Sequence, residues 1–475
     1  MKNIIITLLI TCLLSAQSSK KSTMTVYKDG TALVKQEIIW SNVPRGESVL
    51  KYKDIPISIH KDTPFININN AQVLSQRFVD KTFSSDDFFK SKINERVILI
   101  TTKAKKLYTD FKFKIPNKMK SGIYAVKLFN RNDEFYIPFC VKPKKKSKKN
   151  KILFLMPTAS YLAYANNRIG IDVPETELVC GRLIEMNKHD IYLQEHPELG
   201  LSFYDLHKDG SPVFYSSKKR PIINFQPKSI GKLGGIGSNV WQFNADTHIT
   251  GWLDNFGYDF DVITDSDLQT EGLELIRDYS VIITGTHPEY YSLKMIKAIE
   301  KFKNIGGRLM YLGGNGFYWR ISYDTKSPDI IECRKSEGGI RTVETKPGES
   351  YTSTTGEYSG LWRRNGIPPN KLTGIGMVSQ GFDVSSPYYR TNESYNKKVK
   401  FIFNGVKEKI IGNFGLSGGG ASGLEIDSVN KDLGSPDNIL ILASSKKHTD
   451  VYMMTPEDML DPAPGMGGTE AEIIK

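Results

Sequence analysis

The first part of the chain alternates apolar and polar residues in the manner typical of β-strands. Residues 25–40 alternate in this way on both sides of Asp29-Gly30, a dipeptide that favours a tight hairpin turn. Residues 122–141 form two further runs of this kind around a polar Arg-Asn-Asp segment. This part shows no catalytic arrangement of residues. The pattern therefore predicts an all-β, sandwich-like module over residues 22–141.

The pattern changes near residue 151, where short apolar runs begin to alternate with longer amphipathic ones. The apolar runs fit buried strands and lie at residues 151–156, 260–264, 281–284 and 308–312. The amphipathic runs at 246–257 and 293–305 fit helices, since glycine closes each of them. This alternation predicts an α/β domain over residues 152–475, built on a doubly wound, mainly parallel sheet.

Residues 321–430 have a different texture, rich in Gly, Ser and Thr. Short strand-like runs such as 400–403 interrupt it. We expect loops and antiparallel strands there.

Charge is concentrated in one place. The formal net charge is +12, and seven lysines lie within residues 142–151, so that +5 (12 − 7) remains without them. Aromatic residues are not interleaved with these lysines, so a nucleic-acid groove is not indicated. We interpret residues 142–151 as a solvated linker, with an anionic surface partner as the second interpretation.

The N-terminus indicates export. Lys2 precedes an apolar run at residues 4–14, which is too short to span a bilayer, and small residues follow it. We predict a signal peptide over residues 1–18, a periplasmic or secreted location and no membrane span. The remaining cysteines, Cys140, Cys180 and Cys333, are odd in number and include no CxxC pair, which disfavours a disulfide framework or a thiolate zinc site.

Ligands of doubly wound sheets bind beyond the carboxyl ends of the strands. That rule directs attention to residues 157–166, 285–291 and 313–319. The second of these turns holds His287 and Glu289, an imidazole and a carboxylate two residues apart. A glutamate near a helix N-terminus also has a structural explanation, since it complements the helix dipole.

Three further clusters carry polar or aromatic groups. Tyr204 opens a loop dense in charged residues, and Tyr161 and Tyr164 follow the first apolar strand with a spacing that also suits a helix core. Glu425 lies between two apolar residues after a glycine-rich run, in a strand-like context that points its carboxylate to one face. No Lys-Ser or Lys-Thr follows those glycines, so the run is not a nucleotide-binding Walker loop.

The α/β part resembles class I glutamine amidotransferases, which carry a nucleophilic cysteine in a turn between a strand and a helix. The corresponding turns contain no cysteine here, and Cys180 and Cys333 lie outside them. A thiol nucleophile is therefore disfavoured.

In their order, the clusters resemble the N,N-dimethylformamidase large (beta) subunit family. The similar segments are PTASYLAYANN, YDLHKDGSPVFYSSKKRP, WQFNADTHITGWLDNFGYDFDVITD, GTHPEYYS, IGGRLMYLGGNGFYWR, WRR and GGGASGLEID, within a stretch from near Gly122 to about Gly468. Seven ordered motifs make this resemblance more specific than any single motif.

The resemblance implies a mononuclear ferric (Fe3+) centre held by two tyrosines and one glutamate. By motif position these are Tyr164, with Tyr161 as the competing choice, Tyr204 and Glu289. It also implies Glu425 as general base and His287 beside the metal. Phenolate and carboxylate oxygens are hard donors that suit a hard ferric ion. The expected activity is hydrolysis of the C–N bond of a small amide such as N,N-dimethylformamide, giving formate and an amine.

The resemblance further implies a small partner subunit and a homo-oligomer. The alternative is a non-catalytic exported binding protein, with carbohydrate as one ligand, on the same scaffold. A third reading is hydrolysis of a different bond by the same iron site. The joint presence of Tyr164, Tyr204, His287, Glu289 and Glu425 favours the enzyme.

Overall fold

The computed structural model describes the chain in segments. These are residues 17–26, 32–40, 98–101, 104–107, 113–129, 134–144, 149–168, 188–229, 241–336, 338–339, 341–343, 345–414, 419–455 and 472–474. The chain divides into two compact units, Met1–Lys81 and Thr82–Lys475.

The described residues of the first unit form an antiparallel hairpin. β1 (Gln17–Val26) pairs with β2 (Ala32–Trp40) from Gln17↔Trp40 to Val26↔Ala32. The two strands flank Asp29-Gly30, as the alternation predicted, although residues 27–31 lie outside the described residues. Most of the predicted signal peptide, residues 1–16, also lies outside them.

Two more hairpins open the second unit. β3 (Ile98–Thr101) pairs with β4 (Ala104–Leu107), and β5 (Gly122–Phe129) pairs with β6 (Glu134–Val141). Ser121 fastens the second hairpin to the domain that follows, because its Oγ accepts from Val262 N at 2.8 Å and donates to Val262 O at 3.2 Å. Residues 41–97 lie outside the described residues, so the sandwich-like module over 22–141 stays a prediction.

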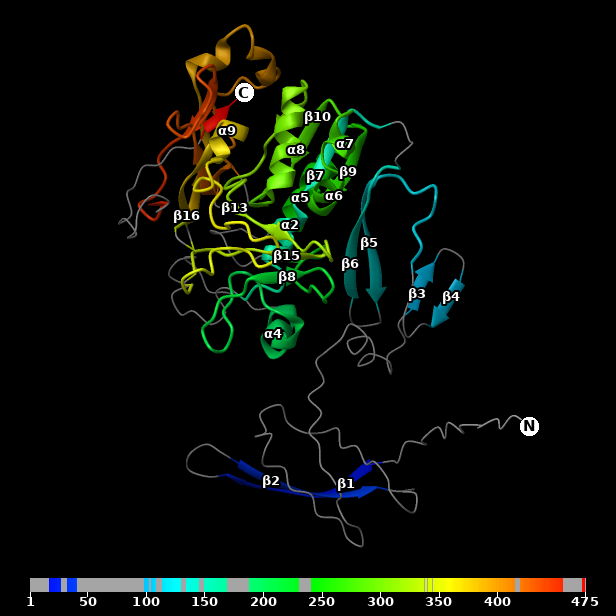
Figure 1. Ribbon diagram of the computed structural model, residues 1–475. Helices are drawn as coiled ribbons and strands as arrows, with labels where there is room; N and C mark the ends of the chain where they lie inside the picture. Colours follow the sequence, from blue (N-terminus) through cyan, green and yellow to red (C-terminus); the bar gives the residue numbers. More distant parts are fainter. Residues whose placement is uncertain are drawn as a thin grey trace, which may run out of the picture. The chain divides into compact units, whose positions relative to one another are not determined.

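A four-stranded parallel sheet forms the centre of the second unit (Figure 1). Its strands are β7 (Ile152–Met156), β9 (Phe260–Thr264), β10 (Val281–Thr284) and β12 (Arg308–Met310), in the spatial order β12-β10-β7-β9. β7 is the most deeply buried, with Leu153, Phe154 and Leu155 at most 1% exposed. Continuous apolar runs are needed here because a central parallel strand packs on both faces.

Helices connect these strands. They are α2 (Thr158–Ala163), α5 (Phe243–Asn255), α6 (Asp265–Glu271), α7 (Leu273–Ile276) and α8 (Leu293–Asn304). α6 begins with a capping box between Thr264 and Asp267, and α8 begins where the Ser292 hydroxyl accepts from Met295 N. We propose a doubly wound, amidotransferase-like arrangement for residues 152–475, since strands and helices alternate around a parallel sheet.

Smaller sheets complete the unit. Their strands are β8 (Tyr215–Ser217), β11 (Tyr290–Tyr291), β13 (Trp319–Arg320), β14 (Ser322–Tyr323), β15 (Ile330–Glu332), β16 (Gly376–Ser386), β17 (Tyr388–Arg390), β18 (Ile410–Ile411), β19 (Ser422–Ser428), β20 (Ile441–Ser445), β21 (Met453–Met454) and β22 (Glu472–Ile474). Except for the parallel pair β11–β13, all of these strands pair antiparallel. The remaining helical segments are α4 (Lys188–Glu195), η1 (Pro197–Leu199), α9 (Pro369–Thr373), η2 (Asn392–Tyr395) and η3 (Lys400–Phe403).

The prediction of a strand at 400–403 was wrong, because this run is the 3₁₀-helix η3. Val399 and Phe403 are both buried in one small core with Leu442, whereas Phe401 and Ile402 are exposed. Val399 and Phe403 are four positions apart, which places them on the same face of a helical turn. In a strand, residue 401 would share a face with both of them and would also be buried.

The lysine-rich run is fixed at both described ends. Lys142 pairs with Asp267 at 2.9 Å and with Glu271 at 2.6 Å, and Lys149 pairs with Asp278 at 3.4 Å. Residues 145–148 lie outside the described residues, as does Cys180. None of the helices in the described segments has the length and apolar character needed to cross a membrane.

Candidate functional site

Two neighbouring strands of the parallel sheet lead into the candidate site. β7 and β10 pair side by side, but the chain continues from β7 to β9 on one side and from β10 to β12 on the other. The strand order therefore reverses between them, and ligands of open α/β sheets bind at such a reversal, beyond the carboxyl ends. β7 leads there into α2, and β10 leads into the turn at 285–289.

Buried hydrogen bonds fix this turn. Asp246, on α5, accepts from Thr286 N at 2.5 Å and from Thr286 Oγ1 at 2.9 Å. A Cβ at Gly285 would lie 2.7 Å from Asp246 Oδ1, so only glycine allows this approach. Ser160 Oγ accepts from Glu289 N at 3.0 Å. The α2 and α5 helices thus set the position of the Glu289 backbone.

Two phenols and one carboxylate converge beyond this turn. Tyr164 Oη donates to Glu289 Oε2 at 2.8 Å, and Tyr204 Oη donates to Tyr164 Oη at 2.5 Å. Tyr204 Oη also lies 3.2 Å and 3.3 Å from the two Glu289 oxygens, and 2.6 Å from Tyr290 Oη. The rings of Tyr164 and Tyr204 stack with centroids 4.3 Å apart. Three segments that are distant in the sequence therefore bring phenol and carboxylate oxygens close together.

The protonation of these groups follows from their surroundings. Burial, and then the Glu289 charge, raise the pKa of both Tyr164 and Tyr204 well above the ordinary phenol value. Burial opposes ionisation of Glu289, but His287, with smaller contributions from Lys335 and Tyr164, outweighs burial and lowers the pKa of this carboxyl. Without a cation the phenols are therefore protonated beside an ionised carboxylate. A cation held by the three oxygens would favour the phenolate forms.

His287 joins this carboxylate to a second one. Its Nε2 lies 3.0 Å from Glu289 Oε2, and its Nδ1 lies 3.2 Å from Glu425 Oε2. Burial lowers the pKa of His287, but the carboxylates of Glu425 and Glu289 outweigh that effect and raise the pKa to about 9. Burial raises the pKa of Glu425, and the negative charge of Glu289 acts in the same direction. An imidazolium thus lies between two acidic groups.

Asn315 and Lys335 also belong to the cluster, and our sequence reasoning did not single them out. Asn315 Nδ2 donates to Glu289 Oε1 at 3.3 Å and to Glu425 Oε1 at 3.2 Å. Lys335 Nζ lies 3.3 Å from the centroid of the Tyr204 ring. The strand pattern directed attention to the turn at 313–319 but did not distinguish Asn315 within it, and no local pattern distinguishes Lys335.

Lys335 is an unusual lysine. Its side chain is 3% exposed, and its Nζ has no hydrogen-bond partner among the described residues. Burial lowers the pKa of Lys335 to about 7, although the charge of Glu289 favours its protonation. A buried ammonium without a hydrogen-bonding partner is costly, and Lys335 places such an unpaired donor over the Tyr204 ring, beside the cluster.

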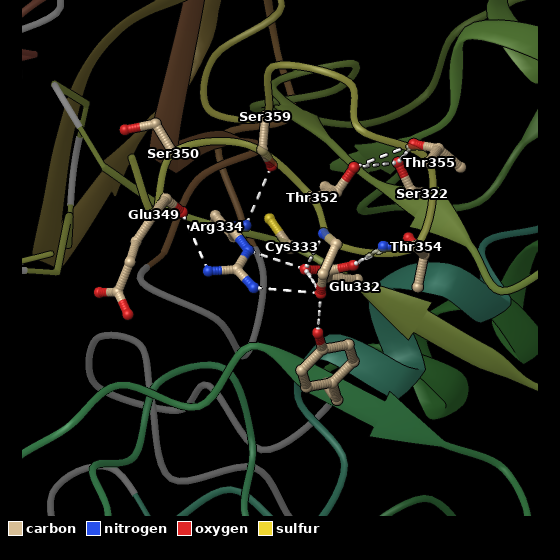
Figure 2. A network of polar contacts seen from close by, with 12 residues as sticks. Ser322, Glu332, Cys333, Arg334, Glu349, Ser350, Thr352, Thr354, Thr355 and Ser359 are labelled. Carbon is tan, nitrogen blue, oxygen red and sulfur yellow. Dashed lines mark hydrogen bonds and ion pairs between the residues drawn. The ribbon is translucent and has the colours of Figure 1, made fainter. Parts of the chain in front are cut away.

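A network of polar contacts around Glu332 and Arg334 fixes the segment that leads from β15 to Lys335 (Figure 2). The Glu332 carboxylate accepts from Arg334 Nε at 2.7 Å, from Ser353 N at 2.9 Å and from Thr354 N at 2.9 Å. Arg334 Nη1 also donates to Glu349 O at 3.1 Å. Glu332 is fully buried, and its charge is balanced by the Arg334 guanidinium. The loop at 349–354 is thus tied to the end of β15.

The residues present fit a mononuclear iron. Within the described segments no group of three or more His, Cys, Asp and Glu side chains could hold a metal, so a metal here would require phenolic oxygens. Tyr164, Tyr204 and Glu289 supply two phenols and a carboxylate within 3.3 Å of one another. Such hard oxygen donors suit a hard ferric ion better than a soft one.

Of the two competing tyrosines, only Tyr164 lies in this cluster. The Tyr161 hydroxyl donates instead to Asp246. Burial raises the pKa of Asp246 to about 6, and that of Tyr161 well above its ordinary value. Tyr161 therefore acts with Asp246 in supporting the turn, and Tyr164 is the residue whose oxygen reaches Glu289.

The comparisons with known proteins cover the same part of the chain. Residues 100–468 match the family model described as N,N-dimethylformamidase beta subunit-like, C-terminal. The N,N-dimethylformamidase beta subunits of Paracoccus aminophilus and of an Alcaligenes species are each 40% identical over 368 residues, or 77% of this chain. The chain spans about half the length of these relatives, since the match covers 48% of each.

Proposed function

Because the chain belongs to the N,N-dimethylformamidase beta subunit-like, C-terminal family, we propose that it hydrolyses the C–N bond of a small amide such as N,N-dimethylformamide. The products would be formate and an amine. One structural observation supports this proposal in addition to the family match. The five residues Tyr164, Tyr204, His287, Glu289 and Glu425 form one connected cluster of hydrogen bonds and close contacts.

Tyr164, Tyr204 and Glu289 would hold a single ferric ion. Such an ion, when bound, would act as a Lewis acid that polarises the amide carbonyl. The protein supplies the water-poor surroundings in which this charge stabilisation is strong, since Tyr164 and Glu289 are at most 4% exposed.

Glu425 is the proposed general base. Its side chain is 19% exposed, which makes it the most accessible of the three residues Glu425, His287 and Glu289. Asn315 donates to Glu425 Oε1, which fixes the carboxylate and leaves its other oxygen facing His287. In this arrangement Glu425 accepts a proton from the water that adds to the carbonyl carbon.

His287 is the proposed proton donor to the leaving amine. Glu425 and Glu289 raise its pKa to about 9 in the metal-free site, and the Glu425 carboxylate would favour the protonated imidazole with a ferric ion bound as well. One water adds to the carbonyl carbon, the C–N bond breaks, and the nitrogen leaves with a proton from His287. Glu425 then returns the proton taken from water to His287. No electrons are transferred to or from the substrate.

The relatives are named as beta subunits, and we propose a small partner subunit and a homo-oligomer for this chain as well. Co-expression with a candidate small subunit and measurement of the complex mass would test both. A single-chain monomer that is fully active would contradict this part of the proposal.

Metal analysis combined with an assay for amine release tests the main proposal. The purified chain should contain about one iron per molecule and should release an amine from a panel of formamides. Glu289→Gln should lose iron and activity together, because a neutral amide is a poorer ligand than a carboxylate. Glu408→Gln, at an exposed glutamate that is not part of the cluster, is the matched control. Unchanged iron content in Glu289→Gln would remove Glu289 from the metal site.

A further inference from the structure

The segment 395–414, drawn in orange in Figure 1, exposes large apolar side chains that the folded core does not use. They are Tyr395, Phe401, Ile402, Val406, Ile410 and Phe414. Phe401 is 60% exposed and Phe414 is 80% exposed. In the run Lys400–Phe403 only Phe403 enters a core. Six exposed large apolar residues within these 20 residues are a high local density, and contiguous exposed apolar surface marks interaction sites.

The segment is an ordered platform. The Arg390 guanidinium lies 3.9 Å from the ring centroid of Phe403 and 4.5 Å from that of Tyr395, and its Nη1 donates to Val406 O at 3.0 Å. Arg390 N also donates to Lys409 O at 2.9 Å. The partly exposed Arg390 guanidinium thus contacts both halves of the segment, and the exposed side chains are presented on a defined backbone.

Lysines are interspersed in the sequence with these apolar residues. Residues 395–414 contain five lysines (Lys397, Lys398, Lys400, Lys407 and Lys409) and a single glutamate, Glu408, which gives a net charge of +4 (5 − 1). All six of these charged residues are exposed. A ligand for this surface must accept apolar side chains at its centre and carry negative charge around them.

We propose that segment 395–414 docks on the surface of a lipid bilayer that contains anionic lipids. Phenylalanine and isoleucine entering the boundary between headgroups and acyl chains, with lysines beside anionic headgroups, is the pattern of interfacial membrane attachment. Protein–protein interfaces share the enrichment in aromatic residues but are depleted in lysine, and lysine is the abundant charged residue here. The cations here are lysines, whose long stems let the ammonium groups remain in water while the apolar parts are buried.

Sedimentation of the full chain with vesicles tests this proposal. We expect at least tenfold tighter binding to vesicles of phosphatidylglycerol and phosphatidylcholine than to phosphatidylcholine alone, and weaker binding at high salt because salt screens charge. The variant Phe401→Ser/Ile402→Ser should reduce binding at least tenfold. Both positions are exposed, so the variant should fold normally, which its unfolding temperature will confirm.

Two controls separate this segment from the rest of the surface. Phe256→Ser removes an aromatic residue that is 67% exposed elsewhere, and Lys118→Glu/Lys326→Glu reverses two exposed lysines outside the segment. Each should change binding less than twofold, whereas Lys397→Glu/Lys398→Glu should weaken it severalfold. Absent vesicle binding, or equal losses in controls and test variants, would overturn the proposal. If Phe401→Ser/Ile402→Ser instead abolishes association with a partner protein and vesicles do not bind, the surface is a protein interface.

Discussion

The imidazole of His287 and the carboxylate of Glu425 lie 3.2 Å apart, although one belongs to the turn after β10 and the other to strand β19. This contact connects the parallel sheet to a separate antiparallel one. It also places the protonated imidazole of His287 beside the carboxyl group of Glu425, and burial raises the pKa of that carboxyl group. The pair gives the site a proton donor and a proton acceptor, which the proposed amide hydrolysis would use.

Glu425→Gln should retain iron and lose turnover. The amide cannot accept a proton from water, and loss of a general base slows catalysis by about 10²–10⁴-fold. Iron content and amine release are the two measurements. The exposed Glu393→Gln variant serves as control. Full activity in Glu425→Gln would exclude Glu425 as the base.

Tyr204→Phe and Tyr161→Phe should differ in the visible spectrum. Tyr204 contributes an oxygen to the cluster with Glu289, so its loss should weaken a tyrosinate-to-iron absorption band and lower iron occupancy. Tyr161 bonds to Asp246 instead, so its variant should retain the band. Loss of the band in Tyr161→Phe, with Tyr204→Phe unaffected, would reverse the assignment of the two tyrosines.

Asp246→Asn should change the pH dependence of stability. The pKa of Asp246 is about 6 in the folded chain against 3.8 for an ordinary aspartate, so the folded chain binds an extra proton between these values. Stability from this group is therefore fully present below about pH 4 and is lost as pH rises through about 6. Two pKa units correspond to at most about 3 kcal/mol.

Urea unfolding at intervals from pH 4 to pH 7 measures this effect. Relative to the original chain, Asp246→Asn should gain stability as the pH rises, by up to about 3 kcal/mol at neutral pH. Asp259→Asn, at an exposed aspartate, is the matched control. Parallel curves for Asp246→Asn would show that the carboxyl titrates alike in the folded and unfolded chains.

Glu332→Ala should destabilise the fold by about 3–5 kcal/mol, because it leaves the buried Arg334 guanidinium without its carboxylate. Glu349→Ala should cost less than about 1 kcal/mol, since that side chain is partly exposed. In the double variant Glu332→Ala/Arg334→Ala the loss should be smaller than the sum of the two single losses. Additive losses, measured by urea unfolding, would show that the two side chains do not act as a pair.

Much of the candidate site could be predicted from the sequence because its residues lie in turns after recognisable strands. His287 and Glu289 follow the apolar run that forms β10, and Glu425 lies in the predicted strand that forms β19. Burial of both faces of a parallel strand leaves a continuous apolar run, which is visible without a structure. The run at 400–403 misled us, because a short apolar run does not distinguish a strand from a helical turn.

The sequence by itself determined which side chains were available and in which turns they lie. Only the tertiary structure decided that Tyr164 reaches Glu289 whereas Tyr161 reaches Asp246, because this depends on how α2 packs against α5 and the turn after β10. The same holds for Asn315 and Lys335, whose partners are distant in the sequence. Local periodicity records the burial of each residue, whereas the distance between two side chains depends on the packing of whole elements against one another.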